Sequence, residues 1–177
     1  MDLRTRLLDA AARLLDAEGI EAVTIRETAR RCGVSHGAPR RHFPSRTTLL
    51  GHLAKRVAAE LAAELDGTDE SPRGLADAYV AFAARRPNAF DLLLRHDLVE
   101  ASGADLRSAT LPLIRRWQTA WLAAHPADTN ALARLMAVHG IASFVSHHAH
   151  TVIGLDPAEL LTAVIHGDAG NTTEVQR

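Results

Sequence analysis

Basic side chains gather in one stretch of this chain, and the ligands that suit them are phosphate groups. Between residues 26 and 56 the chain holds eight basic residues and one acidic residue. They are Arg26, Arg30, Arg31, Arg40, Arg41, Arg46, Lys55 and Arg56, with Glu27 as the acid. The whole chain of 177 residues has a net charge of −1, so this excess is local. A basic patch on a near-neutral protein favours nucleic-acid binding. Its plainer interpretation is a solvated basic face on an ordinary helical hairpin.

Residues 24–46, TIRETARRCGVSHGAPRRHFPSR, have the pattern of two short helices joined by a tight turn. Thr24 followed by Glu27 has the form of a capping box, which satisfies amides of the first helical turn. Gly33 can take the left-handed backbone that ends a helix, and the Ser35 hydroxyl can cap the second helix. The pattern predicts a helix-turn-helix whose second helix enters a DNA major groove.

The predicted DNA contacts come from this segment and from the start of the helix behind it. We expect the second helix to face base edges and residues near helix N-termini to contact phosphates. The expected DNA-binding residues are Thr24, Arg26, Ser35, His36, Gly37, Ala38, Arg40, Arg41, His42 and Arg46. Pro39 lies inside the second helix, where its ring removes one early backbone hydrogen bond.

Hydrophobic periodicity predicts helices along the whole chain, and neither a strand pattern nor an internal repeat appears. An apolar stripe from Leu3 to Leu15 predicts the first helix, and a long helix begins behind Pro44-Ser45. Polar segments predict loops at residues 67–74, 100–105 and 125–128. The expected later helices span residues 74–86, 87–94, 106–124, 129–151 and 157–165. The fold class is therefore all-α, with about nine helices.

The N-terminal segments LLDAAARLLDAEG (7–19), VTIRETARRCGVS (23–35) and HFPSRTTLL (42–50) resemble the TetR family of bacterial transcriptional regulators. The resemblance implies a three-helix DNA-binding domain and the start of a long fourth helix. Thr28, Pro39 and Arg40 depart from the usual pattern, in which an aliphatic, a buried aliphatic and a phosphate-binding tyrosine are common. Arg40 can still reach a phosphate or read guanine with its planar fork.

The segment AVHGIASF (137–144) resembles the tryptophan-histidine-glycine signature of one group of C-terminal domains in this family, with Val138 in place of the tryptophan. Together the resemblances imply residues 1–48 as the helix-turn-helix domain, residues 49–166 as a ligand-binding and dimerisation domain, and residues 167–177 as a flexible tail. They also imply a homodimeric repressor that a small effector releases from operator DNA, and the aromatic residues of the later helices favour an apolar or aromatic effector.

The expected helix at residues 129–151 has an apolar seam and, beside it, a more polar seam with small residues. Leu135, Val138, Ala142, Val145, Ala149 and Val152 form one seam, and Met136, His139, Ser143, His147 and His150 form the other. We expect one seam to pack inside the subunit and the other to meet a partner, and the spacing leaves open which does which. The predicted dimer contacts are Ser143, His147, Leu160, Leu161, Val164 and Ile165. The alternative is a monomer whose helices close on each other.

Most of the aromatic residues fall in three consecutive expected helices, between residues 74 and 124. They predict an effector pocket lined by Tyr79, Phe82, Phe90, Trp117 and Trp121, with His139 as its polar anchor. The plainer interpretation of such a cluster at helical spacing is hydrophobic core.

Other function classes find less support in the sequence. His147, His148 and His150 could form a metal site only with a distant third ligand such as His96 or Asp97, so we expect no metal and no cofactor. No recognisable catalytic arrangement appears, which argues against an enzyme. A protein-interaction module that has lost DNA binding remains the alternative. The single Cys32, with no signal core and no apolar run of membrane-spanning length, predicts a cytoplasmic protein away from membranes.

Overall fold

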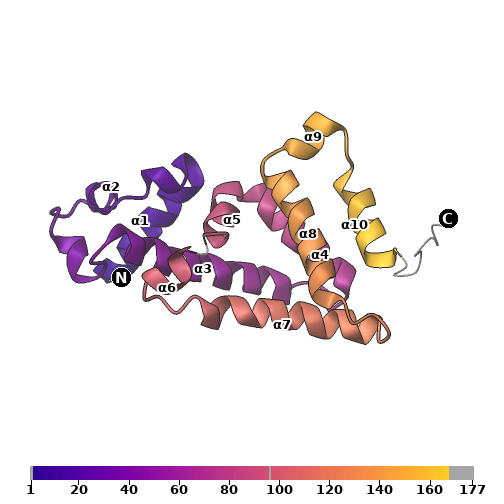
Figure 1. The fold of residues 1–177 in the computed structure, drawn as a ribbon. Helices are drawn as coiled ribbons and strands as arrows, with labels where there is room; N and C mark the ends of the chain where they lie inside the picture. The colour runs from indigo at the N-terminus through magenta and orange to yellow at the C-terminus, as the bar shows by residue number, and fades with distance from the viewer. Residues whose placement is uncertain (1, 96, 168–177) are drawn as a thin grey trace, which may run out of the picture.

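The computed structural model describes residues 2–95 and 97–167 of the chain, and its regular elements in these residues are all helical (Figure 1). The N-terminal half contains α1 (Leu3–Glu18), the 3-10 helix η1 (Ile20–Ala22), α2 (Ile25–Arg31), the 3-10 helix η2 (Ala38–Arg41) and α3 (Arg46–Asp66). The C-terminal half contains α4 (Pro72–Arg85), α5 (Pro87–Leu93), α6 (Asp97–Ala101), α7 (Arg107–Ala124), α8 (Ala131–Ser146), α9 (Ala149–Ile153) and α10 (Pro157–His166). The predicted all-α class is confirmed. The predicted flexible tail falls, except for Gly167, outside the described residues.

Polar caps explain where most of the longer helices begin. In five helices the side chain before the first residue accepts a hydrogen bond from an amide of the first turn. These caps are Asp2, Thr24, Ser45, Ser71 and Asp156. Because Ser71 caps α4, that helix begins at Pro72, two residues before the predicted start, and proline is well suited to a first helical position.

Helix α3 connects the two halves of the molecule. It runs from the end that carries α1 and α2 into the bundle formed by the C-terminal helices (Figure 1). It packs against α1, α4, α5, α6 and α7. One cluster of buried apolar side chains extends from Leu7 in α1 to Ile165 in α10. The helix therefore belongs to both halves, and the domain boundary predicted at residue 48 falls within its first turn.

The second helix of the predicted helix-turn-helix is shorter than expected. Its only regular part is η2, and no side chain caps that element, so the prediction of an α-helix capped by Ser35 is wrong. Pro39 explains the difference, since it has no amide to donate into an α-helical ladder. Pro39 is itself buried, and Phe43 behind it is fully buried, as predicted.

Two later elements also differ from the prediction. The helix expected to reach Thr151 ends at Ser146, because His148 adopts a left-handed backbone with φ 57°. The short helix α9 follows it at an angle (Figure 1). The loop expected at residues 100–105 is partly taken up by α6, which packs on α3.

Thr28 in α2 is buried with a relative exposure of 1 %, and its hydroxyl has no hydrogen-bond partner in the described structure. A buried hydroxyl left unpaired costs free energy, since it has given up its bonds to water. We expect Thr28→Val, which keeps the shape and removes the hydroxyl, to raise the free energy of unfolding by about 1 kcal/mol.

Urea denaturation of the purified variant would measure this change. Thr68→Val is the matched control, because the Thr68 hydroxyl donates to the carbonyl oxygen of Leu65 at 2.8 Å and its removal should destabilise. A Thr28→Val variant that is as destabilised as the control would show that the Thr28 hydroxyl is satisfied in solution.

Candidate nucleic-acid interface and ligand cavity

The turn between α2 and η2 is held by backbone bonds. Gly33 has φ +64°, a left-handed conformation that is cheap only for glycine. The amide of Gly33 donates to the carbonyl of Arg30 and that of Val34 to the carbonyl of Ala29, each at 3.1 Å. The cap of α2 is formed by Thr24, whose hydroxyl accepts from the amide of Glu27 at 3.1 Å. Sequence reasoning therefore placed this turn correctly.

Acidic side chains neutralise several of the eight basic residues. Arg30 and Arg31 both pair with Glu27, at 2.6 and 2.8 Å, and Arg31 also reaches Glu18 at 2.6 Å. A complete capping box would require the Glu27 carboxylate to accept a hydrogen bond from the amide of Thr24. The carboxylate instead binds the two arginines.

Three further basic residues also have partners. Arg56 is held by Asp9 and Glu60, and Lys55 lies 3.9 Å from Asp105. The Arg46 guanidinium donates to the carbonyl oxygens of Val23 and Ile20, at 2.9 and 2.7 Å. It also reaches Glu21 at 3.1 Å. Arg46 therefore fixes the start of α3 to the segment before α2, which is a positioning role that the sequence did not reveal.

Three arginines of the patch have no partner within residues 2–95 and 97–167. They are Arg26, Arg40 and Arg41, and all three are exposed. Among the other predicted DNA-binding residues, Ser35, His36 and Gly37 are exposed. Thr24, Ala38, His42 and Arg46 are half-buried. The free positive charge of the patch is therefore concentrated on α2 and η2.

Two basic residues of α1 also reach the helix-turn-helix, and sequence reasoning missed both. Arg6 donates to the carbonyl of Cys32 at 2.8 Å, and the Cys32 thiol donates to the carbonyl of Arg6 at 3.3 Å. The Arg4 guanidinium lies over the ring of Phe43, 5.5 Å from its centroid. These contacts join α1 to the helix-turn-helix, and only the basic character of the N-terminal segment could have signalled them.

A cavity of about 440 Å³ lies among α3, α4, α5, α7 and α8. Of the six residues predicted for an effector pocket, Tyr79, Trp117 and His139 line it. The other three, Phe82, Phe90 and Trp121, do not. Most of the remaining lining is aliphatic, from Leu61, Leu65, Leu75, Leu93, Leu106, Leu113, Ile114, Leu135 and Val138. Half of the six predicted residues therefore line a cavity, and whether it binds an effector stays a prediction.

Packing explains why these three aromatic residues are excluded. Trp121 is stacked on the rings of Trp117 and His125, with centroid distances of 5.8 and 4.2 Å. Phe90 lies behind the cavity wall, with its centroid 5.6 Å from that of Tyr79. Phe82 is fully buried, with the Arg86 guanidinium 5.7 Å from its ring centroid.

One polar pair marks the apolar cavity. The hydroxyl of Tyr79 and Nδ1 of His139 are 2.8 Å apart. Burial raises the pKa of Tyr79 above its ordinary value, so the phenol stays protonated at neutral pH. Two arginines at the rim are already held by acids, Arg95 by Asp97 and Arg116 by Asp66 and Glu70. The cavity can therefore take an apolar molecule that carries one hydrogen-bonding group.

The two faces of α8 differ in burial, and only one of them lies inside the subunit. Val138, Ala142 and Val145 are buried, whereas the opposite face leaves large apolar side chains in solvent. These exposed residues are Leu132 (49 %), Met136 (57 %) and Phe144 (45 %). With Gly140 they recur every four residues, which defines an outward apolar stripe on α8.

The six predicted dimer contacts are split by the fold. Leu161 and Ile165 are buried inside the single chain, since that face of α10 packs on α4 and α8. These two side chains are therefore covered by the chain's own helices, so the packing of the single chain does not favour a contact between them and a partner. Ser143, Leu160 and Val164 are half-buried, and His147 is exposed.

Two further predictions concern metals and membranes. Within the described residues, no group of three or more histidine, cysteine or acidic side chains is placed to hold a metal ion. In the same residues no helix is long and apolar enough to cross a membrane.

Residues 7–53 match the family described as bacterial regulatory proteins, tetR family. A comparison with curated proteins gives no match. Among solved structures, SCO4313, described as a regulatory protein, is 22% identical with a TM-score of 0.74, over 93% of each chain. A Rhodococcus sp. RHA1 protein of unknown function is 29% identical with a TM-score of 0.65, over 94% of this chain and 93% of its own. A transcriptional regulator from Aquifex aeolicus VF5 is 18% identical with a TM-score of 0.60, over 93% and 96%.

Residues 7–53 therefore have the sequence of the N-terminal domain of that family, and the described part of the chain shares the overall fold of these solved structures.

Because of Glu27, the stability of the helix-turn-helix should fall at acid pH. Hydrogen bonds from Arg30, and then from Arg31, lower the pKa of its carboxyl to about 2 from 4.5. A lowered pKa in the folded state gives stability that is present above pH 4.5 and lost as the pH falls toward 2. Thermal unfolding at two pH values would measure it. Glu27→Gln should melt lower than wild type at pH 4.5 and like wild type near pH 2. A difference in melting temperature that stays constant with pH would contradict this account.

Proposed function

We propose that the protein is a homodimeric, DNA-binding transcriptional regulator, and specifically a repressor that leaves its operator when a small apolar or aromatic effector enters the cavity. The observation that carries the DNA-binding part is the set of three exposed arginines on the helix-turn-helix that have no partner in the described part of the chain. Arg26 lies in the first turn of α2, where helix N-termini favour phosphate. Arg40 and Arg41 lie on η2, and a guanidinium can read guanine through two parallel hydrogen bonds.

Two helices support the homodimer. Helix α8 is apolar on the face buried in the subunit and also on the outward stripe of Leu132, Met136 and Phe144. A helix that is apolar all round is normally buried all round. Helix α10 packs beside α8, and two such helices from each chain form a four-helix interface in a two-fold dimer. Two-fold symmetry also suits a palindromic operator.

The path from the cavity to the DNA-binding end supports release by an effector. Leu106 lines the cavity, and the loop before it rests directly on α3. A Cβ added at Gly51 of α3 would lie 2.1 Å from that of Ser102 and 3.2 Å from that of Ala104. An effector that displaces this loop therefore acts on α3, and it lowers DNA affinity by as much as it prefers the displaced state.

The likeness of residues 137–144 to the tryptophan-histidine-glycine signature is part of this proposal. His139 of that segment is the polar group of the cavity, which fits a ligand-sensing role for it.

Replacing Arg41 should relax DNA sequence discrimination. We expect Arg41→Ala to lose about 1–3 kcal/mol of preference for a specific duplex over a random one, if the arginine is bidentate to guanine. The specific duplex can be selected from a random library by the wild-type protein, and fluorescence anisotropy gives both affinities. Arg30→Ala is the matched control, because that guanidinium is already held by Glu27. Equal effects of the two variants, or none, would remove η2 from the interface.

Charges on the outward face of α8 should break the dimer. We expect the double variant Leu132→Glu, Phe144→Glu to be monomeric, since association would bury its carboxylates unpaired. Leu132 is chosen because Met136 of the same stripe also lines the cavity. Both side chains are exposed in the single chain, so the fold should survive. Sedimentation velocity measures assembly and circular dichroism checks folding. Leu122→Glu, at an exposed apolar position of α7, is the control and should stay dimeric. A folded double variant that is still dimeric would place the interface elsewhere.

The two tryptophans should report effector binding differently. Trp117 lines the cavity and Trp121 does not, so a ligand from a panel of aromatic and alkyl alcohols should quench the fluorescence of Trp117. The signal should persist in Trp121→Phe and vanish in Trp117→Phe. Tyr79→Phe should weaken the same ligand about tenfold, because it removes a buried hydrogen-bonding group, and it should leave DNA affinity unchanged. A signal that follows Trp121 instead would overturn the assignment of the cavity.

A further inference from the structure

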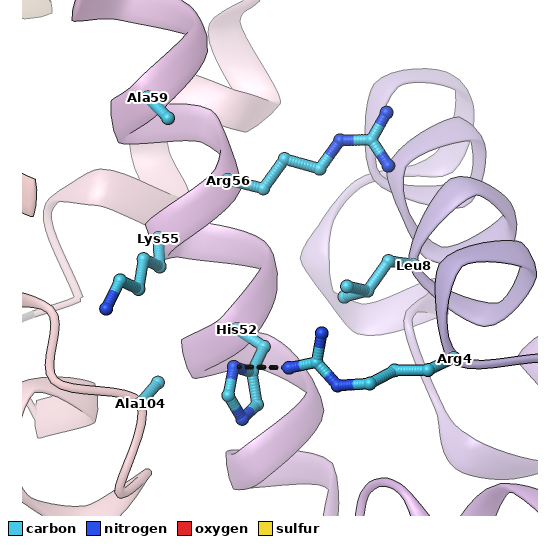
Figure 2. A pocket seen from close by; sticks show the side chains of 7 residues that line it. All are labelled: Arg4, Leu8, His52, Lys55, Arg56, Ala59 and Ala104. Atoms are coloured by element: carbon cyan, nitrogen blue, oxygen red, sulfur yellow. Dashed lines mark hydrogen bonds between the residues drawn. The ribbon is translucent and has the colours of Figure 1, made fainter. Parts of the chain in front are cut away.

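A second, more open hollow of about 390 Å³ lies between α1 and α3. Its floor is one face of α3, formed by His52, Lys55, Arg56 and Ala59 at helical spacing. Arg4 and Leu8 of α1 form one wall and Ala104 forms the other. Figure 2 shows Arg4 and His52 directed toward each other across this groove. We call it the α1–α3 groove.

Every ionisable residue that lines the α1–α3 groove is basic. Arg56 is neutralised by Asp9 and Glu60. Arg4 has no acidic partner in the described residues. Its guanidinium donates to Nδ1 of His52 at 3.1 Å. Cations held close together repel one another, so this arrangement leaves positive charge that a ligand could neutralise.

The contacts of Arg4 hold its guanidinium in place before any ligand arrives. The guanidinium lies 5.5 Å from the ring centroid of Phe43, which is fully buried. Phe43 also meets the His52 ring edge-on, with centroids 5.6 Å apart. On the opposite side, Lys55 is tethered to Asp105 at 3.9 Å, the loosest ion pair in the described residues, and the Asp105 side chain is largely exposed. Lys55 can therefore turn to a ligand at small cost, while Arg4 is already in position.

The protonation of His52 is tied to the same charges. An arginine can only donate, so the Arg4 bond requires an unprotonated Nδ1 and leaves the proton of the neutral ring on Nε2. Burial, followed by the charges of Arg4 and Lys55, lowers the pKa of His52 below its ordinary value. The groups that face the ring are Arg4 from α1, Lys55 from α3 and the neutral ring of Phe43. An anion among them would favour the protonated ring and free Arg4 from Nδ1.

We propose that the α1–α3 groove binds a small oxyanion of the phosphate type, held by Arg4, Lys55 and a ring N–H of His52. A tetrahedral oxyanion can accept bonds from several directions, and arginine and lysine are its usual partners. The apolar side chains of Leu8, Ala59 and Ala104 would accommodate the carbon part of a phosphorylated metabolite.

Occupancy of this site would act on the same elements as the effector. Its ligands come from α1 and α3, and Ala104 lies on the loop that rests on Gly51. A bound anion would therefore tie α1, α3 and that loop together. The site does not depend on the DNA-binding proposal, because no residue of α2 or η2 lines it.

Sulfate is the probe for this site, since its charge is constant near neutral pH and any pH dependence then comes from the protein. Calorimetry of the full chain should show saturable sulfate binding that strengthens as the pH falls and His52 gains a proton. Arg4→Gln and Lys55→Gln should each weaken it about tenfold, because each removes a charged hydrogen bond. Arg13→Gln, an exposed arginine of α1 that does not line the groove, is the control and should bind as wild type does.

Two further measurements separate this site from general charge effects. Nuclear magnetic resonance should show the pKa of His52 rising when sulfate binds, and His52→Gln should bind sulfate without the pH dependence. Absence of saturable binding, or equal weakening by Arg13→Gln, would overturn the proposal. If sulfate does not bind while Arg4→Gln weakens binding to a random DNA duplex, the groove is a contact for the DNA backbone and the proposal of a free ligand fails.

Discussion

The burial of α3 is the constraint on which the rest of the molecule depends. Of its residues, only Ala59, Ala63 and Asp66 are exposed, while its leucines and valine are buried against helices from both halves. A 21-residue helix is about 30 Å long, so one rigid element extends from the helix-turn-helix to the end of the cavity. Because no layer of solvent separates the halves, neither can change its packing on α3 without a consequence for the other. The proposed release by an effector relies on this continuous packing.

Ion pairing is the second constraint, because an arginine that is bound to an acid is not available to bind a phosphate. The chain is rich in arginine along its whole length, and most of these side chains pair with nearby acids. Glu27 is the clearest case, since it holds Arg30 and Arg31 on α2, whereas Arg26 in the same helix pairs with no acid among the residues that the structure describes. The positive face proposed to contact DNA is therefore narrower than the composition indicates. It is also better defined, since fixed ion pairs hold its neighbours in place.

Much of the fold followed from local rules in the sequence. Thr24, Ser45 and Asp156 begin helices where capping chemistry predicts, and Gly33 takes the left-handed turn. Where prediction failed, the cause was tertiary. The break after Ser146 carries no glycine or proline, so no local signal marks the left-handed backbone of His148. The shortening of η2 is the exception, because Pro39 was visible and its effect was underestimated.

The candidate sites were predicted less completely, for a similar reason. Trp117 and Trp121 lie on one face of α7, yet the first lines the cavity and the second is stacked beneath it. Helical spacing gives the face on which a residue lies but not how deeply neighbouring helices cover it. The same limit applies to α10, whose Leu161 and Ile165 are buried within the chain. Arg4 was missed because its partners, His52 and Phe43, are distant in sequence and meet it only in the fold.

The salt dependence of DNA binding tests the central claim most directly. The affinity of the full chain for duplex DNA should fall linearly on a double-logarithmic plot against salt, with a slope of about 0.9 per phosphate contact. Replacing Arg26, Arg40 and Arg41 together with glutamine should make this slope shallower by several contacts in the dimer. The same protein should remain folded and keep its cavity. A slope near zero in the wild type, or an unchanged slope in the triple variant, would contradict the account.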